Sequence, residues 1–247
     1  YARNWIQQNP PLGNTFQRWM LKHQSKFFVT INGHWPNQPQ QCISFENPCL
    51  TEQECEDGMR CIDSKEYDSV LDFCFVGRLE SAKGVHRIIE AFKDWHHERI
   101  GKIHLIGDGS ERKAFELLVG DDKRFVFHGF IDRNKVAQIL SQSHVFLFPS
   151  QSEGFPKAIG EAANYGCIVV ATDVSCISHY IAHEECGYLI PESEATGKQL
   201  RLTIQQAMDN PNLRQMATNA HAVARKFTYD YYLNHIQKSI IEELGFH

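Results

Sequence analysis

The chain has 247 residues, which suffices for one large domain or for one domain with part of another. Its hydrophobic and charged fractions, 42% and 22%, are those of an ordinary globular protein and argue against disorder. A formal net charge of −5, without a block of Lys and Arg, argues against non-specific nucleic-acid binding. No apolar run approaches the roughly 18–20 residues of a membrane-spanning helix.

The first part of the chain differs from the rest. Residues 1–24 have a helical pattern broken by prolines, and residues 27–31 predict a strand that is followed by a loop. Residues 51–69 are acidic and turn-like, which is typical of a linker. We therefore expect residues 1–46 to be the tail of a preceding domain and residues 47–70 to be a linker. No signal-peptide pattern opens the chain. Because it lacks an initiator Met and begins at Tyr1 in mid-pattern, we expect a fragment of a longer protein.

Four of the eight cysteines fall in the first quarter of the chain, at Cys42, Cys49, Cys55 and Cys61. Their spacing contains no C-x-x-C pair of the kind found in zinc and redox sites. Some of the other four lie within apolar runs, where cysteine behaves as a small hydrophobic residue. The pattern favours reduced thiols, as in the cytosol, with a structural zinc in the early cluster as the alternative.

From residue 71 onward, short runs of β-forming residues alternate with amphipathic stretches of helical spacing. The six predicted strands are residues 73–77, 102–107, 124–129, 144–149, 167–173 and 187–191. The predicted helices between them are residues 85–95, 111–118, 134–140, 156–166 and 177–182. Strands that alternate with single helices indicate βαβ units, hence an α/β, Rossmann-like parallel sheet with helices on both faces.

The end of the chain has no strand pattern. Residues 193–244 predict three helices, of which the last begins near Thr228. We therefore assign residues 71–228 to the Rossmann-like domain and residues 229–247 to a C-terminal helix.

Ligands of open parallel sheets bind beyond the carboxyl ends of the strands, so the loops there are the candidate sites. The loop at residues 77–84 carries Arg78 and Lys83 between two glycines. A guanidinium and an ammonium at one strand end suit a diphosphate. Two solvated loop cations are the structural alternative.

Two further loops are less specific. Gly107 and Gly109 begin a dinucleotide-binding fingerprint, but Arg112 stands where its third glycine belongs, so a hydride-transfer cofactor site is not favoured. After the next strand, Gly129 permits close backbone approach and Phe130 has the shape to cover a flat ring. Phe130 could equally seal the end of the sheet.

The most specific stretch is SEGFPKAIGE, at residues 152–161. Pro156 suits the first position of a helix, whose free amides and dipole form an anion site. Lys157 and Glu161 are four residues apart and share one helix face, while Glu153 lies in the loop ahead of it. An anion site with two carboxylates that accept sugar hydroxyls suits a nucleotide-sugar. The alternative is a capped surface helix with one Lys–Glu pair.

GRLESAKG, LIGDGSER, FHGF and PSQSEGFPKAIGEAANYGCIVVATD follow one another in this order and spacing, and the chain thereby resembles retaining glycosyltransferases of the group 1 type, family four by sequence. The resemblance runs from about Phe73 to the C-terminus. It implies the GT-B fold of two facing Rossmann-like domains, of which this chain would carry the donor-binding C-terminal one. The last helix, at residues 229–244, resembles the one that crosses back onto the N-terminal domain.

The resemblance also implies roles for single residues. Arg78 and Lys83 match the basic pair that binds the donor diphosphate. Glu153 matches the catalytic glutamate near the donor sugar, and Glu161 matches the one that holds the ribose hydroxyls.

Backbone contacts to the donor sugar and phosphates fall on Gly154, Phe155, Pro156 and Lys157 by the same resemblance. Contacts to the base fall on Phe130 and Ile131. No metal or cofactor is expected, and the sequence has no D-x-D motif.

The expected reaction is therefore transfer of a sugar, a hexose or a relative, from a nucleotide to a glycan or lipid-linked acceptor with retention of configuration. The sequence leaves UDP-, GDP- and ADP-linked donors open. Because the resemblance places the acceptor site in the other domain, we expect this chain alone to bind nucleotide weakly and to transfer no sugar. A nucleotide-sugar-binding domain without turnover and a glycoside hydrolase that uses Glu153 and Glu161 are the alternatives. The expected location is the cytoplasm, with peripheral association at the inner membrane face as a further option for polysaccharide biosynthesis.

Overall fold

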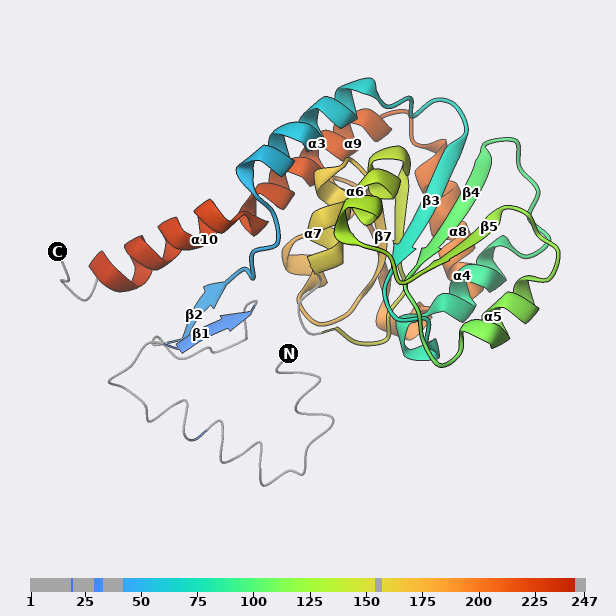
Figure 1. The fold of residues 1–247 in the computed structure, drawn as a ribbon, viewed down its shortest axis with the longest axis horizontal. Helices are drawn as coiled ribbons and strands as arrows, with labels where there is room; N and C mark the ends of the chain where they lie inside the picture. Colours follow the sequence, from blue (N-terminus) through green and yellow to red (C-terminus); the bar gives the residue numbers. More distant parts are fainter. Residues whose placement is uncertain (1–18, 20–28, 33–41, 154–156, 243–247) are drawn as a thin grey trace.

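The structure is a computed structural model that describes Trp19, Val29–Asn32, residues 42–153 and residues 157–242. Its main sheet has six parallel strands in the order β5-β4-β3-β6-β7-β8 (Figure 1). These strands are β3 (Leu71–Val76), β4 (Ile100–Ile106), β5 (Phe125–Gly129), β6 (Val145–Phe148), β7 (Ile168–Asp173) and β8 (Gly187–Pro191). All four residues of β6 are buried, as expected of a central strand with helices on both of its faces.

Helices cover both faces of the sheet (Figure 1). On one face, Phe92 of α4 and Phe115 of α5 belong to the same buried cluster as Phe73 of β3. On the other face, Leu140 of α6 and Ile159 of α7 are buried with Phe146 of β6. The α-helices are α3 (Glu52–Ser64), α4 (Val85–Phe92), α5 (Arg112–Val119), α6 (Arg133–Gln142), α7 (Lys157–Asn164), α8 (Gly197–Asp209), α9 (Leu213–Ala224) and α10 (Tyr229–Ile236).

The prediction of an α/β domain with a parallel sheet is confirmed, and so are its six strands. The three C-terminal helices are also present, the last beginning at Tyr229 after the N-cap Thr228. The predicted helix at residues 177–182 is wrong, because only a 3-10 turn forms there, at Ile177–His179. A stretch of six residues offers too few i→i−4 hydrogen bonds to offset the entropic cost of starting a helix. Other short turns lie at Glu192–Glu194 and Arg225–Phe227.

The turn-like reading of residues 51–69 is also wrong, because α3 occupies most of this stretch. Thr51 and Glu54 form a capping box, in which each side chain accepts a hydrogen bond from the other residue's backbone N–H. The acidic side chains that suggested a linker lie mainly on the outer face. Gly58 faces inward, where an added Cβ would meet the Asn164 carbonyl oxygen at 2.3 Å. The acidic composition of residues 51–69 therefore belongs to an amphipathic helix that packs on α7, and not to a linker.

The N-terminal part adds a small parallel sheet of β1 (Val29–Asn32) and β2 (Cys42–Phe45). The strand predicted at residues 27–31 thus overlaps β1, whereas the helical pattern of residues 1–24 lies outside the described residues except at Trp19. β2 packs against α10, because the ring of Phe45 stacks on the ring of His235 with their centroids 4.3 Å apart.

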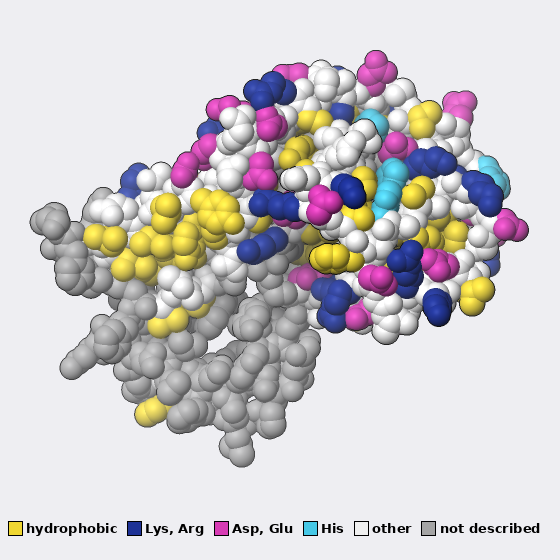
Figure 2. Space-filling view, in the orientation of Figure 1, with side chains coloured by type: hydrophobic (Ala, Val, Ile, Leu, Met, Phe, Trp, Pro, Cys, Tyr) yellow, Lys and Arg dark blue, Asp and Glu magenta, His cyan; other side chains and the backbone are white. Residues whose placement is uncertain are grey.

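Helix α10 continues as a π-helix at Gln237–Glu242. Figure 2 shows hydrophobic side chains gathered along α10, among them Tyr229, Tyr231 and Leu233, which are exposed. No helix in the described part of the chain is long and apolar enough to cross a membrane.

Candidate functional site

The loops after β3, β4 and β6 meet at the carboxyl edge of the sheet. Gly84 has a φ of 77°, and a Cβ on it would lie 2.0 Å from the Pro149 carbonyl oxygen. Gly107 has a φ of 124°, and its added Cβ would lie 2.0 Å from the Gly77 carbonyl oxygen. These glycines are therefore needed where neighbouring loops lie in close backbone contact. Close approach of a ligand is not required to explain them.

Lys83 and Glu153 are brought together at this edge. Lys83 ends the 3-10 turn η1 (Ser81–Lys83) after β3, and Glu153 lies in the loop between β6 and α7. The Lys83 Nζ atom lies 2.7 Å from Glu153 Oε1, and the two side chains are only 20% and 10% exposed. Low exposure strengthens the attraction between the charges, since little water screens them.

Glu153 has a second neighbour that the sequence patterns did not indicate. Its backbone N–H donates to the Ser175 hydroxyl oxygen at 3.3 Å, and the Ser175 hydroxyl donates to its carbonyl at 2.5 Å. Ser175 follows β7, so the loops after three strands converge on Glu153. The rule that ligands gather at strand ends would have included this loop, although no motif marks the serine.

Arg78, the other half of the predicted diphosphate pair, has a different environment. Its side chain is 69% exposed and its Nη1 lies 3.1 Å from Glu80 Oε1. Its neighbour Ser81 donates its backbone N–H to Glu111 Oε1 at 3.0 Å. Hydrogen bonds from Ser81 lower the pKa of the Glu111 carboxyl, which accepts them and so ties the turn after β3 to the residue that precedes α5.

Glu161 lies on α7 beside residues of two other helices. Arg133, at the start of α6, places its Nη2 2.8 Å from Glu54 Oε1 and its Nε 4.0 Å from Glu161 Oε1. Arg133 also donates to the backbone carbonyl of Cys49. Burial raises the pKa of the Glu161 carboxyl, and Glu54 adds to the rise while Arg133 and Lys157 oppose it. Sequence reasoning missed Arg133 and Glu54, since both lie in elements whose local pattern carries no motif.

The predicted base-binding residues follow β5. Phe130 is 89% exposed and Ile131 is partly buried. An aromatic ring presented to solvent at a strand end is available to a flat ligand. Gly154, Phe155 and Pro156 lie outside the described residues, and Lys157 begins α7 with an exposed side chain.

The cysteines of the early cluster are free thiols. Burial raises the pKa of Cys49 to about 12 and that of Cys55 to about 11, so both carry their protons at neutral pH. Within the described residues, no group of three or more His, Cys, Asp or Glu is arranged to hold a metal ion.

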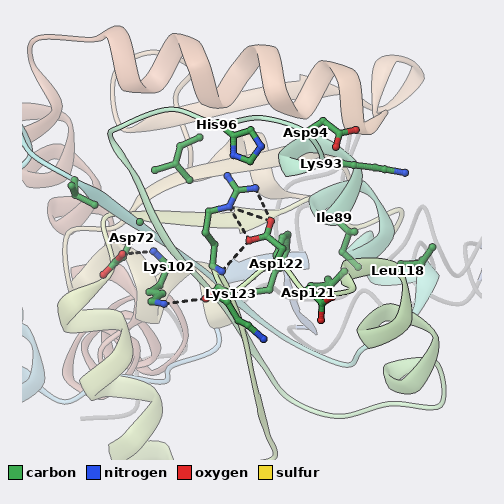
Figure 3. Close-up of a pocket in the computed structure, with 16 residues that line it drawn as sticks. Asp72, Ile89, Lys93, Asp94, His96, Lys102, Leu118, Asp121, Asp122 and Lys123 are labelled. Atoms are coloured by element: carbon green, nitrogen blue, oxygen red, sulfur yellow. Dashed lines mark hydrogen bonds and ion pairs between the residues drawn. The ribbon is translucent and has the colours of Figure 1, made fainter.

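A pocket of about 870 Å³ lies at the opposite, amino edge of β3, β4 and β5 (Figure 3). One ion pair lies in it, with Arg124 Nη2 2.6 Å from Asp122 Oδ2, and Lys102 donates to the Lys123 backbone carbonyl at 3.0 Å. We place the candidate site at the carboxyl edge instead, because ligands of open parallel sheets bind there.

Comparison with known proteins gives a consistent result. A family model described as "Glycosyl transferases group 1" matches residues 63–223. The lipopolysaccharide glucosyltransferase WaaG of Escherichia coli K12 is 30% identical over 154 residues, which are 60% of this chain and 40% of WaaG. The N-acetyl-alpha-D-glucosaminyl L-malate synthase of Bacillus anthracis is 27% identical over 174 residues, 68% of this chain and 44% of that enzyme.

Among solved structures, Anabaena HepE in complex with UDP and glucose aligns with a TM-score of 0.70 at 19% identity. That alignment covers 96% of this chain and 68% of HepE, and it shows a shared fold. The chain spans less than half of the length of the two curated relatives named above.

Proposed function

The chain belongs to the glycosyl transferases group 1 family, and from this we propose that it carries the nucleotide-sugar-binding part of a glycosyltransferase. The observation that supports the proposal most strongly is the Lys83–Glu153 pair. A cation suited to phosphate and a carboxylate suited to sugar lie 2.7 Å apart at the carboxyl edge of a parallel sheet.

In the proposed reaction, an acceptor hydroxyl oxygen bonds to the sugar's anomeric carbon as the bond from that carbon to the diphosphate oxygen breaks. Negative charge grows on the leaving diphosphate, which takes up the acceptor's proton. Lys83 and Arg78 neutralise that charge, together with the backbone amides at the start of α7. Arg78, at 69% exposure, is free to swing toward an incoming phosphate by exchanging Glu80 for it. Lys83 similarly exchanges Glu153 for the diphosphate.

The carboxylates serve the sugars of the donor. Glu153 lies beside the reacting sugar, and Glu161 accepts hydrogen bonds from the ribose hydroxyls, with its charge supported by Arg133. Phe130 and Ile131 contact the base, while backbone groups of residues 154–157 contact the sugar and phosphates. Retention of configuration at the transferred sugar is part of the proposal.

For the donor and the acceptor we propose chemical classes and not single compounds. HepE was solved with UDP and glucose, so UDP-sugars are the first donors to test, ahead of GDP- and ADP-sugars. A glycan or lipid-linked acceptor fits relatives such as the lipopolysaccharide glucosyltransferase WaaG. We propose that donor binding requires neither a metal nor a cofactor.

Calorimetric titration of the chain with UDP-, GDP- and ADP-sugars tests this function, with and without EDTA. We expect one nucleotide class to bind, an unchanged affinity in EDTA, and no sugar transfer by this chain alone. A complete protein that binds the donor but never transfers sugar would favour a binding domain. Release of sugar from a simple glycoside without nucleotide would favour a hydrolase.

A further inference from the structure

Ser175 has an unusual backbone conformation for its residue type. It follows β7 with a φ of +58°, in the left-handed region that residues other than glycine rarely adopt. Strained conformations of this kind persist where the surrounding structure holds them, and they gather at functional sites. The contacts of Ser175 therefore need an explanation.

Those contacts join two loops through one hydroxyl group. The hydroxyl accepts the Glu153 N–H at 3.3 Å and donates to the Glu153 carbonyl at 2.5 Å, across 22 residues of sequence. A serine hydroxyl has one hydrogen to donate and lone pairs that accept. The single side chain of Ser175 therefore fixes both the backbone N–H and the backbone carbonyl of Glu153. Alanine and glycine offer neither function.

The side chain of Glu153 is held from another direction. Lys83 lies 2.7 Å from its carboxylate, so the loop after β3 fixes the side chain while the loop after β7 fixes the backbone. Glu153 itself lies outside any helix or strand.

We propose that Ser175 is a positioning residue that fixes the backbone of Glu153 and thereby aims its carboxylate at the donor sugar. The inference rests on the proposed function. When Lys83 exchanges Glu153 for the donor diphosphate, the hydroxyl of Ser175 keeps Glu153 in place. Its contribution therefore falls on the sugar part of the donor and not on the nucleotide.

The first test needs no ligand. Hydrogen exchange at the Glu153 amide is measured in the unaltered chain and in the variants Ser175→Ala and Ser175→Gly. Both variants should accelerate exchange by at least about fivefold, because the amide loses its acceptor. Glycine also relieves the positive φ, so equal effects of the two variants assign the change to the hydroxyl.

Ser178, an exposed serine in the turn Ile177–His179 of the same loop, supplies the matched control Ser178→Ala. This control should leave exchange at the Glu153 amide unchanged. Unchanged exchange in both Ser175 variants, or equal acceleration in the control, would overturn the proposal whatever the donor is.

The second test separates positioning from general loosening. Affinities for UDP and UDP-glucose are compared, or those for GDP and GDP-mannose where the donor titration selects guanosine. Ser175→Ala should weaken binding of the nucleotide-sugar roughly tenfold and that of the free nucleotide less than about twofold. Equal weakening of both would reduce Ser175 to a structural role and overturn the inference. Failure of the unaltered chain to bind any nucleotide would instead overturn the proposed function, while the exchange result would still decide whether Ser175 fixes Glu153.

Discussion

The Lys83 ammonium lies 2.7 Å from the Glu153 carboxylate, although the two residues lie in different loops, 70 positions apart in the sequence. The parallel sheet produces this contact, because β3 and β6 are hydrogen-bonded neighbours whose carboxyl ends lie side by side. A charged pair with so little exposure has consequences for both stability and ligand binding.

Removal of one partner should destabilise the fold. Lys83→Met and Glu153→Gln should each lower the free energy of unfolding by roughly 1–2 kcal/mol, because each leaves a poorly solvated partner behind. The double variant should lose less than the sum of the two. Arg78→Met is the matched control, since its 69% exposed side chain should change stability by less than about 0.5 kcal/mol. Urea unfolding curves measure all four, and strict additivity of the two singles would contradict a direct interaction.

Gly84 should be required by a close contact between two loops. Its backbone is left-handed (φ 77°, ψ 17°), and an added Cβ would lie 2.0 Å from the Pro149 carbonyl oxygen. The left-handed conformation alone should cost an alanine about 1–2 kcal/mol. Gly84→Ala should cost roughly 3 kcal/mol or more and weaken nucleotide binding, since it also forces apart the loops after β3 and β6. Thermal and urea unfolding measure the loss, and a loss no larger than that of the left-handed strain alone would contradict the close contact.

His144 should make stability depend on pH. Burial and the nearby Lys65 lower the pKa of His144 to about 4, against the opposing effect of Asp72, and its Nδ1 accepts the Asp72 backbone N–H at 3.0 Å. The unfolded chain binds a proton near pH 6.5 while the folded chain does not, so stability falls as the pH drops from about 6.5 to about 4. The loss should be on the order of 2–3 kcal/mol.

The variant His144→Asn isolates this effect, because its amide oxygen replaces the acceptor without titrating. Its stability should fall less steeply between pH 6.5 and pH 4 than that of the unaltered chain. A residual slope is expected from His104 and His128, whose pKa values burial also lowers. Identical slopes in the two proteins would exclude His144 as the source.

Arg133 should control the ionisation of Glu161. Burial already raises the pKa of Glu161, and Arg133 opposes the rise, so Arg133→Met should raise it further. If the ionised carboxylate accepts the ribose hydroxyls, nucleotide affinity falls on acidification, and the variant should lose affinity at a higher pH. Glu161→Gln should bind weakly and show no such dependence. Lys135→Met, at an exposed position of α6, is the control that should leave the profile unchanged. A profile unaltered by Arg133→Met would contradict the assignment.

The sequence was informative where local pattern and topology agree. Apolar runs such as β6 and β7 specify buried parallel strands, and the strand-end rule then selects the loops with Lys83 and Glu153. Helix α3 was missed, because its acidic face resembles a linker and its burial depends on a close contact between Gly58 and Asn164.

The sequence also could not predict which residues of distant elements contact the two glutamates of the candidate site. Ser175 and Arg133 carry no motif, and they meet Glu153 and Glu161 only because strands and helices remote in sequence pack together. The exposure of the Arg78 side chain could not be predicted from the sequence either, since residue spacing alone does not determine where a long side chain points.

The most direct test of the central claim is calorimetric titration of the unaltered chain and of Lys83→Ala with the nucleotide-sugars that carry UDP, GDP and ADP. We expect the unaltered chain to bind one nucleotide class, and the variant to bind it at least roughly tenfold more weakly, because a charge-assisted contact to the diphosphate is lost. Lys135→Ala should bind as the unaltered chain does. Equal affinity of the unaltered chain and Lys83→Ala, or no binding of any nucleotide-sugar, would contradict a donor site at the carboxyl edge of this sheet.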